Sequence, residues 1–237
     1  MGLSTAPAST LPWVFAGAVL FLALCGLAWR FVLRGEALES LPRRKIVVCY
    51  VALLLLSLVP RLALATAILG VPTDIACFKA WAMAAAENGL SHFYSGAMFV
   101  DYPPGYIYVL GAVGLARSFL GLAHDSAGFL LLVKLPAMLL DLVAAGFLLW
   151  LARKRMSLVQ ACAISLLYAF NPAAIHNSAV YGQVDIFLAL PLVLALTLVL
   201  RGAVLRASAV YAVAVLVKPQ ALLTLAGNSD VKGTGRS

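Results

Sequence analysis

The feature that most constrains this chain is a series of apolar runs, several of which approach or exceed the ~20 residues that a helix needs to cross ~30 Å of hydrocarbon. The runs are continuous rather than alternating, which argues against a membrane β-barrel. Only helices and closed barrels satisfy their backbone hydrogen bonds in lipid. The sequence therefore predicts an all-α, polytopic transmembrane helical bundle of about six or seven spans. The candidate spans are 12–33, 46–70, 103–122, 128–152, 158–171, 184–200 and 207–226.

The composition agrees with a membrane protein and excludes other classes. Of the 237 residues, 64% are hydrophobic and only 11% are charged. The net charge of +8 does not indicate a nucleic-acid partner, because the basic residues form short clusters beside apolar runs. The four cysteines are scattered and form no metal-ligand motif.

The basic clusters also predict an orientation. The first loop carries five basic residues and is expected on the cytoplasmic side: Arg30, Arg34, Arg43, Arg44 and Lys45. The span 46–70 then runs outward and places Asp74 on the external side. Loop 71–102 holds Asp74, Glu87 and Asp101 against a single lysine, Lys79, as expected of an external loop.

A second basic cluster complicates this topology. The segment "ARKR" at 152–155 is also expected in the cytoplasm, yet two apolar runs separate it from the external loop. We interpret 103–122 as a run that does not cross fully, because it opens with two prolines and contains several glycines. If it does cross, 152–155 lies outside.

Within the external loop, "DIACFKAWAMAAAENGL" predicts a short helix. Thr73 or Asp74 can cap its start, and the Asn-Gly pair at 88–89 ends it. Its apolar residues share one face, which predicts a helix at the membrane interface with aromatic side chains at headgroup level: Ile75, Phe78, Trp81 and Ala82. The neighbouring aromatic residues are interpreted as an interface belt, with stacking on a sugar as the alternative: Phe93, Tyr94, Tyr102, Tyr106 and Tyr108.

Three stretches combine polar residues with helix breaks at the membrane boundary. They are the segment from Asp74 to "DYPPGY", the segment "FNPAAIHNSAVYGQVD" at 170–185, and "VKPQ" at 217–220. Irregular backbone at membrane depth is tolerated only where protein or a water-filled cavity covers it. Ionisable groups there are costly and are candidates for function. Together they predict a polar cavity open to the external face.

These stretches also carry a resemblance. The blocks "TDIACFKAWA" to "DYPPGYIYVL", "VKLPAMLLDL", "FNPAAIHNSAVYGQVDIF" and "VKPQAL" occur in this order over roughly residues 70–225. The chain resembles bacterial membrane proteins related to the eukaryotic second mannosyltransferase of GPI-anchor synthesis, the PIG-V group. These proteins belong to the GT-C superfamily of polytopic glycosyltransferases.

The resemblance implies a reaction and a location. GT-C enzymes take a hexose, here mannose-like, from a polyprenyl-phosphate donor and transfer it with inversion on the external face. The acceptor would be a lipid-linked or cell-envelope glycan, and the enzyme would be a multi-pass protein of the bacterial plasma membrane in contact with its lipids. In the superfamily an acidic residue of the first external loop is the catalytic base, and Asp74 occupies that position. Capping of the loop helix is the alternative role for Asp74.

Further residues are substrate-binding candidates. The leaving group would be a lipid phosphate, whose charge needs a cation or amide donors. Lys218 is the candidate cation, with Gln220 and Gln183 as hydrogen-bonding partners of sugar or phosphate. The other candidates are Asp101, Tyr102 and Asp185. The alternative role for Asp101 is only to start a helix, and the alternative for Asp185 is a favourable interaction of its charge with the positive end of a helix dipole.

No metal ligand is assigned, because the sequence has no His, Cys and Asp cluster with the spacing of a zinc site. No cofactor is therefore certain. A divalent cation bridged by Asp74 and Asp101 stays an open alternative, since some GT-C enzymes use one.

Arg61, Lys134 and Asp141 are charged residues that lie well inside apolar spans. Arg61 can extend toward the headgroups or face the cavity. Lys134 and Asp141 are seven residues apart, about two helical turns, which is too far for a direct pair. We therefore expect each of them to pair with another helix in a structural role.

The resemblance also has a limit. GT-C enzymes are usually longer and have further spans after the "KPQ" block, whereas residues 227–237 are polar and aperiodic. The expectation is a GT-C-like membrane domain over 1–226, with 71–102 as its external loop, in a chain shortened at its C-terminus. Two rival functions stay open: an envelope-lipid transporter or flippase with Asp74, Asp185 and Lys218 along its pathway, and an inactive membrane fragment.

Overall fold

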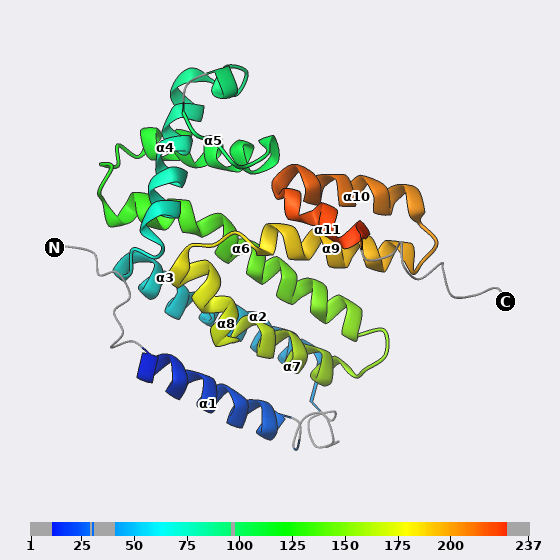
Figure 1. Ribbon diagram of the computed structural model, residues 1–237. Helices are drawn as coiled ribbons and strands as arrows, with labels where there is room; N and C mark the ends of the chain where they lie inside the picture. Colours follow the sequence, from blue (N-terminus) through cyan, green and yellow to red (C-terminus); the bar gives the residue numbers. More distant parts are fainter. Residues whose placement is uncertain (1–10, 29, 31–40, 96–97, 227–237) are drawn as a thin grey trace. The chain divides into compact units, whose positions relative to one another are not determined.

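The computed structural model describes residues 11–28, 30, 41–95 and 98–226, and the regular elements in these ranges are all helical (Figure 1). The prediction of an all-α chain is confirmed for this part. The chain divides into two compact units, 1–75 with 125–183 and 76–124 with 184–237. The predicted tail 227–237 and part of the candidate span 12–33 lie outside the described residues.

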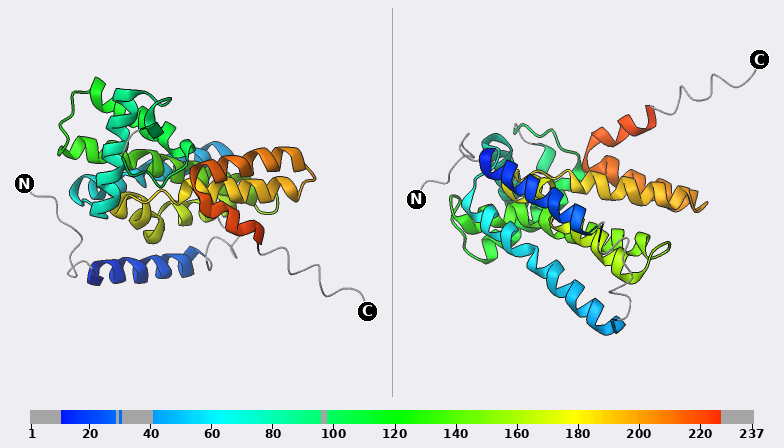
Figure 2. Two further views of the ribbon diagram at one scale, coloured as in Figure 1. Left: turned by 45° about the horizontal axis from the view of Figure 1, so that its top comes forward. Right: turned by 90° about the horizontal axis from the view of Figure 1, so that it is seen from below.

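The first unit is built around the longest helix. Helix α6 packs against α3, α7 and the π-helix η4, and α2 packs against α7. Both Figure 1 and Figure 2 show α6 beside α7. The elements of this unit are α1 (Leu11–Ala28), α2 (Arg43–Leu56), α3 (Leu58–Ala67), α6 (Ala127–Ala152), α7 (Leu158–Ala169), α8 (Pro172–Ile175) and η4 (His176–Tyr181).

The second unit contains most of α4 (Pro72–Asn88), which begins in the first unit. Helices α9 and α10 form a helical hairpin, and α5 packs against α10 (Figure 1). The other elements are η3 (Phe93–Ser95), α5 (Pro104–Phe119), α9 (Ile186–Val199), α10 (Val204–Val217), η5 (Pro219–Leu222) and α11 (Leu223–Ala226).

Two helical segments in the described part of the chain are long and apolar enough to cross a membrane: Arg43–Ala67, with 25 residues, and Ala127–Ala152, with 26. A third is added if α7 and the segment Pro172–Tyr181, bent by 42°, form one span. The predicted six or seven spans are therefore not confirmed. Helix α5 has 16 residues, short of the ~20 needed, which agrees with an incomplete crossing by 103–122.

The loop helix is present, but its start differs from the prediction. Helix α4 ends at Asn88, and Gly89 follows with a left-handed φ of 74°, as expected of the Asn-Gly pair. The predicted cap at Thr73 or Asp74 is wrong, because the helix already begins at Pro72. Proline suits the first turn, where its missing N–H costs no helical hydrogen bond.

The apolar face of α4 is covered by protein. Phe78, Trp81 and Ala82 are each at most 2% exposed. Phe78 and Trp81 pack with Tyr102 and Tyr106, with ring centroids 5.3 to 5.8 Å apart. Phe78, Trp81 and Tyr106 are buried and Tyr102 is half-buried, so these rings contact one another within the second unit, and their place at headgroup level stays a prediction.

Helices α4 and α5 approach each other closely at Gly114, and this contact yields a prediction. A Cβ atom at Gly114 would lie 1.9 Å from the carbonyl oxygen of Ala82. We expect Gly114→Ala to force the helices apart and to destabilise the second unit by about 1–3 kcal/mol or more. Gly146→Ala in α6 is the matched control, because nothing lies within 4 Å of its Cβ position. The measurement is thermal unfolding in detergent, followed by circular dichroism. Equal melting temperatures of the two variants would contradict this packing.

Candidate functional site

The structure brings together two of the predicted site residues at the start of α4. Asp74 lies half-buried in the first helical turn. The side-chain amide of Gln183, 109 residues away in the chain, donates a hydrogen bond to Oδ2 of Asp74. The Thr73 hydroxyl donates to Oδ1 at 3.3 Å. The predicted catalytic carboxylate is thus held by an amide donor.

The backbone after η4 positions Gln183. The π-helix ends at Tyr181, and the next residue, Gly182, has a left-handed φ of 74°. A Cβ atom there would lie 2.7 Å from Cδ1 at the end of the Ile75 side chain, which can shift, so the left-handed φ is what favours glycine at this position. The backbone N–H of Gln183 donates to the Asn177 carbonyl at 2.9 Å, which fixes the chain where it leaves the helix.

The backbone before α4 packs directly against the same end of η4. Gly70 has a φ of 93°, and a Cβ atom there would lie 2.5 Å from the carbonyl oxygen of Tyr181. The Val71 N–H donates to that oxygen at 3.3 Å. The two segments that carry Asp74 and Gln183 therefore touch through their main chains.

Lys134 on α6 links these two segments. Lys134 is 1% exposed, and its ammonium donates to the carbonyl of Ile68 at 2.7 Å on one side. On the other side it donates to the carbonyls of Ala179 at 2.9 Å and Val180 at 3.1 Å. All three N–H groups of the ammonium are thus satisfied. The expectation that Lys134 pairs outside its own helix is confirmed, and its contacts join the two segments that carry Asp74 and Gln183.

Asp141, two turns further along α6, joins a buried polar network. Its carboxylate lies 3.7 Å from Nε of Arg61 and accepts hydrogen bonds from Ser178 at 2.7 Å and Tyr168 at 3.1 Å. Arg61 also donates from Nη1 to the carbonyls of Ser57 and Ala169. The expected structural pairing of Asp141 is confirmed, and Arg61 is fully buried rather than extended to the surface.

Sequence reasoning missed Ser178 and Tyr168 as members of this network. The available signal was the presence of charges inside apolar helices, because such charges pair with polar groups of neighbouring helices. That rule predicts that partners exist. It does not say which serine or tyrosine supplies them.

Three other predicted residues gather in the second unit. Lys218 stands in extended backbone between α10 and η5, where Pro219 interrupts the helical run. Its ammonium forms an ion pair with Asp185, at the N-terminal boundary of α9. The same nitrogen lies 5.9 Å from the centroid of the Tyr102 ring, within cation–π range. Tyr102, Asp185 and Lys218 therefore form one cluster.

Tyr94 supports the segment that leads into this cluster. Its hydroxyl donates to the Tyr102 carbonyl at 3.0 Å. Burial raises the pKa of Tyr94, and the neighbouring Tyr108 raises it further, so the phenol keeps the proton that it donates. Asp101 and Gln220, the other two candidates, are exposed on the same unit.

The prediction of a polar cavity joining all three stretches stays a prediction. Asp74 and Gln183 belong to the first unit, whereas Asp101, Asp185 and Lys218 belong to the second. No group of three or more His, Cys, Asp or Glu side chains placed to hold a metal occurs among the described residues. Asp74 and Asp101 lie in different units, so the alternative of a cation that bridges these two carboxylates also stays a prediction.

Comparison with family models, with curated proteins and with solved structures finds no match to this chain. The Asp74–Gln183 pair and the Tyr102–Asp185–Lys218 cluster are the two groups of contacting polar residues that bear on function.

Proposed function

We propose that the chain is an integral membrane glycosyltransferase of the GT-C type. It transfers a mannose-like hexose from a polyprenyl-phosphate sugar to a lipid-linked or cell-envelope acceptor, with inversion at the anomeric carbon. The observation that carries the proposal is the half-buried Asp74 carboxylate, hydrogen-bonded by the Gln183 amide. A carboxylate held in this way, at the end of an apolar helical segment, suits a general base.

The Asp74 carboxylate takes the proton of an acceptor hydroxyl as that oxygen attacks the anomeric carbon. The new glycosidic C–O bond forms as the bond between that carbon and the lipid-phosphate oxygen breaks, and the electron pair leaves with the phosphate. Gln183 orients the carboxylate through Oδ2 and leaves further lone pairs for the hydroxyl proton. Attack opposite to the leaving group inverts the anomeric configuration.

Lys218 is the candidate for stabilising the departing phosphate. Its pairing with Asp185 holds the ammonium in one place, beside the Tyr102 ring. A phosphate oxygen would then compete with the Asp185 carboxylate for a preplaced cation. Asp101 and Gln220 are assigned to substrate contacts on the same unit.

We place the protein in the bacterial plasma membrane, with Asp74 on the extracytoplasmic side. Arg43, Arg44 and Lys45 begin the 25-residue apolar segment Arg43–Ala67, and Asp74 follows its opposite end. The positive-inside rule assigns the basic start to the cytoplasm.

A transfer assay tests this proposal. The full chain is reconstituted into proteoliposomes with a labelled polyprenyl-phosphate mannose and a lipid acceptor, and labelled product is separated from donor. We expect donor-dependent product with inverted configuration. Movement of intact donor across the bilayer without product would favour the transporter instead, and neither activity would favour an inactive fragment.

A further inference from the structure

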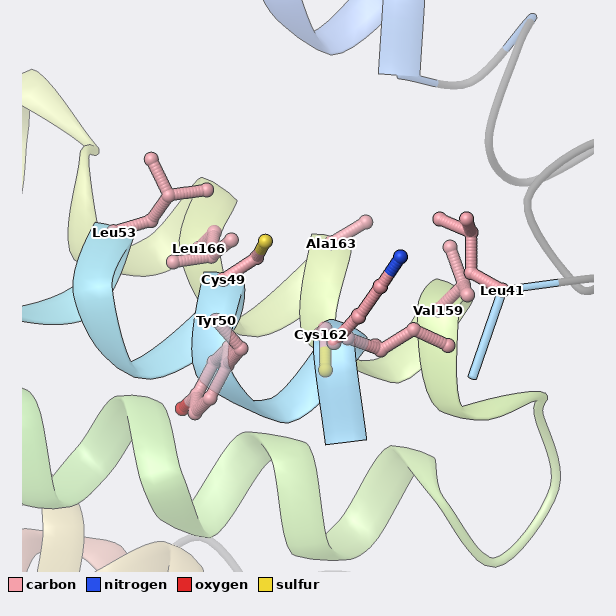
Figure 3. A pocket seen from close by; sticks show the side chains of 10 residues that line it. Leu41, Cys49, Tyr50, Leu53, Val159, Cys162, Ala163 and Leu166 are labelled. Atoms are coloured by element: carbon pink, nitrogen blue, oxygen red, sulfur yellow. The ribbon is translucent and has the colours of Figure 1, made fainter. Parts of the chain in front are cut away.

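An apolar groove of about 470 Å³ lies between α2 and α7 in the first unit. Six side chains make up most of its walls: Cys49, Tyr50 and Leu53 on α2, and Cys162, Ala163 and Leu166 on α7 (Figure 3). The Tyr50 hydroxyl and Ser165 Oγ are 2.9 Å apart and hydrogen-bonded, so the polar atom of Tyr50 is satisfied within the protein. The groove surface itself is left apolar.

The two walls of the groove run in the same direction. Figure 3 shows Leu53 beside Leu166 at one end and Leu41 beside Val159 at the other. The first residues of both helices therefore lie at one end of the groove, which we call its basic end.

The basic end carries a concentration of positive charge. Lys45 lines the groove there and follows Arg43 and Arg44, while α7 begins just after the basic segment 153–155. Helix α2 has no acidic residue in its first turn, and its N-cap, Pro42, supplies no side-chain hydrogen bond. The positive helix terminus thus adds to the side-chain charges.

We propose that this groove binds an anionic glycerophospholipid of the bilayer, with one acyl chain along the groove and the phosphate at Lys45. The volume lies in the ~300–1,000 Å³ range of ligand sites. An apolar slot that ends in clustered lysine and arginine complements both parts of such a lipid, and basic pockets between membrane helices bind anionic headgroups.

This site is separate from the proposed catalytic residues and does not depend on their function. Lys45 is near the start of the segment Arg43–Ala67, whereas Asp74 follows its end. A continuous helix of 25 residues extends about 37 Å. The phosphate of the bound phospholipid is therefore expected at the opposite end of this segment from the proposed base.

The second unit offers an internal comparison. A groove of about 620 Å³ lies between α9 and α10, with Leu192, Leu196 and Tyr211 among its lining residues. None of the residues that line it is charged. It should accept acyl chains without preference for the headgroup, unlike the groove at Lys45.

Chemical labelling of the native cysteines measures whether a lipid occupies the groove. Cys49 is exposed in the groove, whereas Cys77 lies on α4 and serves as a reference. The full chain in detergent is titrated with phosphatidylglycerol or with phosphatidylcholine of the same acyl chains, and maleimide labelling of each cysteine is followed by peptide mass spectrometry. We expect phosphatidylglycerol to protect Cys49 at about fivefold lower concentration than phosphatidylcholine, with Cys77 labelled equally.

Two variants test the two parts of the site. Lys45→Gln should remove the preference for phosphatidylglycerol while both lipids still protect Cys49, and Arg206→Gln in α10 is the matched control. Ala163→Phe should fill the groove and weaken protection by both lipids. Lys45 is exposed, so its replacement tests the headgroup contact without disturbing packing.

The proposal is overturned if both lipids protect wild-type Cys49 at the same concentration, or if Lys45→Gln keeps the preference. Inorganic phosphate is the third ligand in the series. If inorganic phosphate alone protected Cys49 as well as phosphatidylglycerol does, the site would be an anion site, and the lipid assignment would be overturned.

Discussion

An Asp74→Asn variant is expected to bind the polyprenyl-phosphate donor and to transfer its sugar about 10²–10⁴-fold more slowly than the wild type. The amide has the shape of the carboxylate and can still accept the hydrogen bond from Gln183, so the local structure is retained. It cannot accept the hydroxyl proton during attack. The loss should therefore appear in kcat and not in donor affinity.

The measurement is single-turnover transfer in proteoliposomes at saturating donor, with donor binding measured separately. Glu87→Gln is the matched control, because it removes an exposed carboxylate from the same helix. Equal transfer by wild type and Asp74→Asn would remove Asp74 from the reaction. A protein in which both are inactive would instead contradict the proposed function of the chain.

Replacing Lys134 by methionine is expected to weaken the contact between the two segments that carry Asp74 and Gln183. The variant leaves the carbonyls of Ile68, Ala179 and Val180 without their ammonium donor, and each unsatisfied buried group costs about 1–3 kcal/mol. These carbonyls belong to the two segments that carry Asp74 and Gln183. A displacement of about 1 Å between them would lower kcat about 100-fold.

Hydrogen exchange separates this effect from a general loss of stability. In Lys134→Met we expect faster exchange in peptides covering 68–75 and 177–183, with peptides of the second unit unchanged. Lys79→Met is the control, because Lys79 is also buried but donates to the His124 carbonyl in the second unit, at 2.8 Å. Unchanged exchange around Asp74 and Gln183 would show that Lys134 does not hold the two segments together, whatever the transfer activity.

The helix breaks were predictable from local chemistry. Asn88–Gly89, Asn171–Pro172 and Lys218–Pro219 each interrupt a helical run where the sequence predicts it. Proline removes a backbone donor and glycine admits a left-handed φ, so these effects act within a few residues. The start of α4 was mispredicted because a first-turn proline competes with the capping residues that follow it.

The candidate site was predictable as a set of residues and not as a set of contacts. The sequence singled out Asp74, Gln183, Asp185 and Lys218, but it did not pair them. It assigned the α4 aromatics, Tyr102 and Tyr106 to the membrane interface, whereas the fold packs them in one cluster in which Phe78, Trp81 and Tyr106 are buried and Tyr102 is half-buried. A ring at helical spacing fits both lipid and protein, and only the packed neighbour decides between them.

The sequence by itself determined that the described part of the chain is helical and contains apolar segments of membrane length, two or three in the structure, because runs of apolar residues and helix breakers act along the chain. Tertiary structure alone decided that Gln183 meets Asp74, that Lys218 meets Asp185, and that Lys134 binds carbonyls from two segments. These partners are separated by 33 to 109 residues. A buried polar group must find a partner, but which partner it finds depends on how the helices pack.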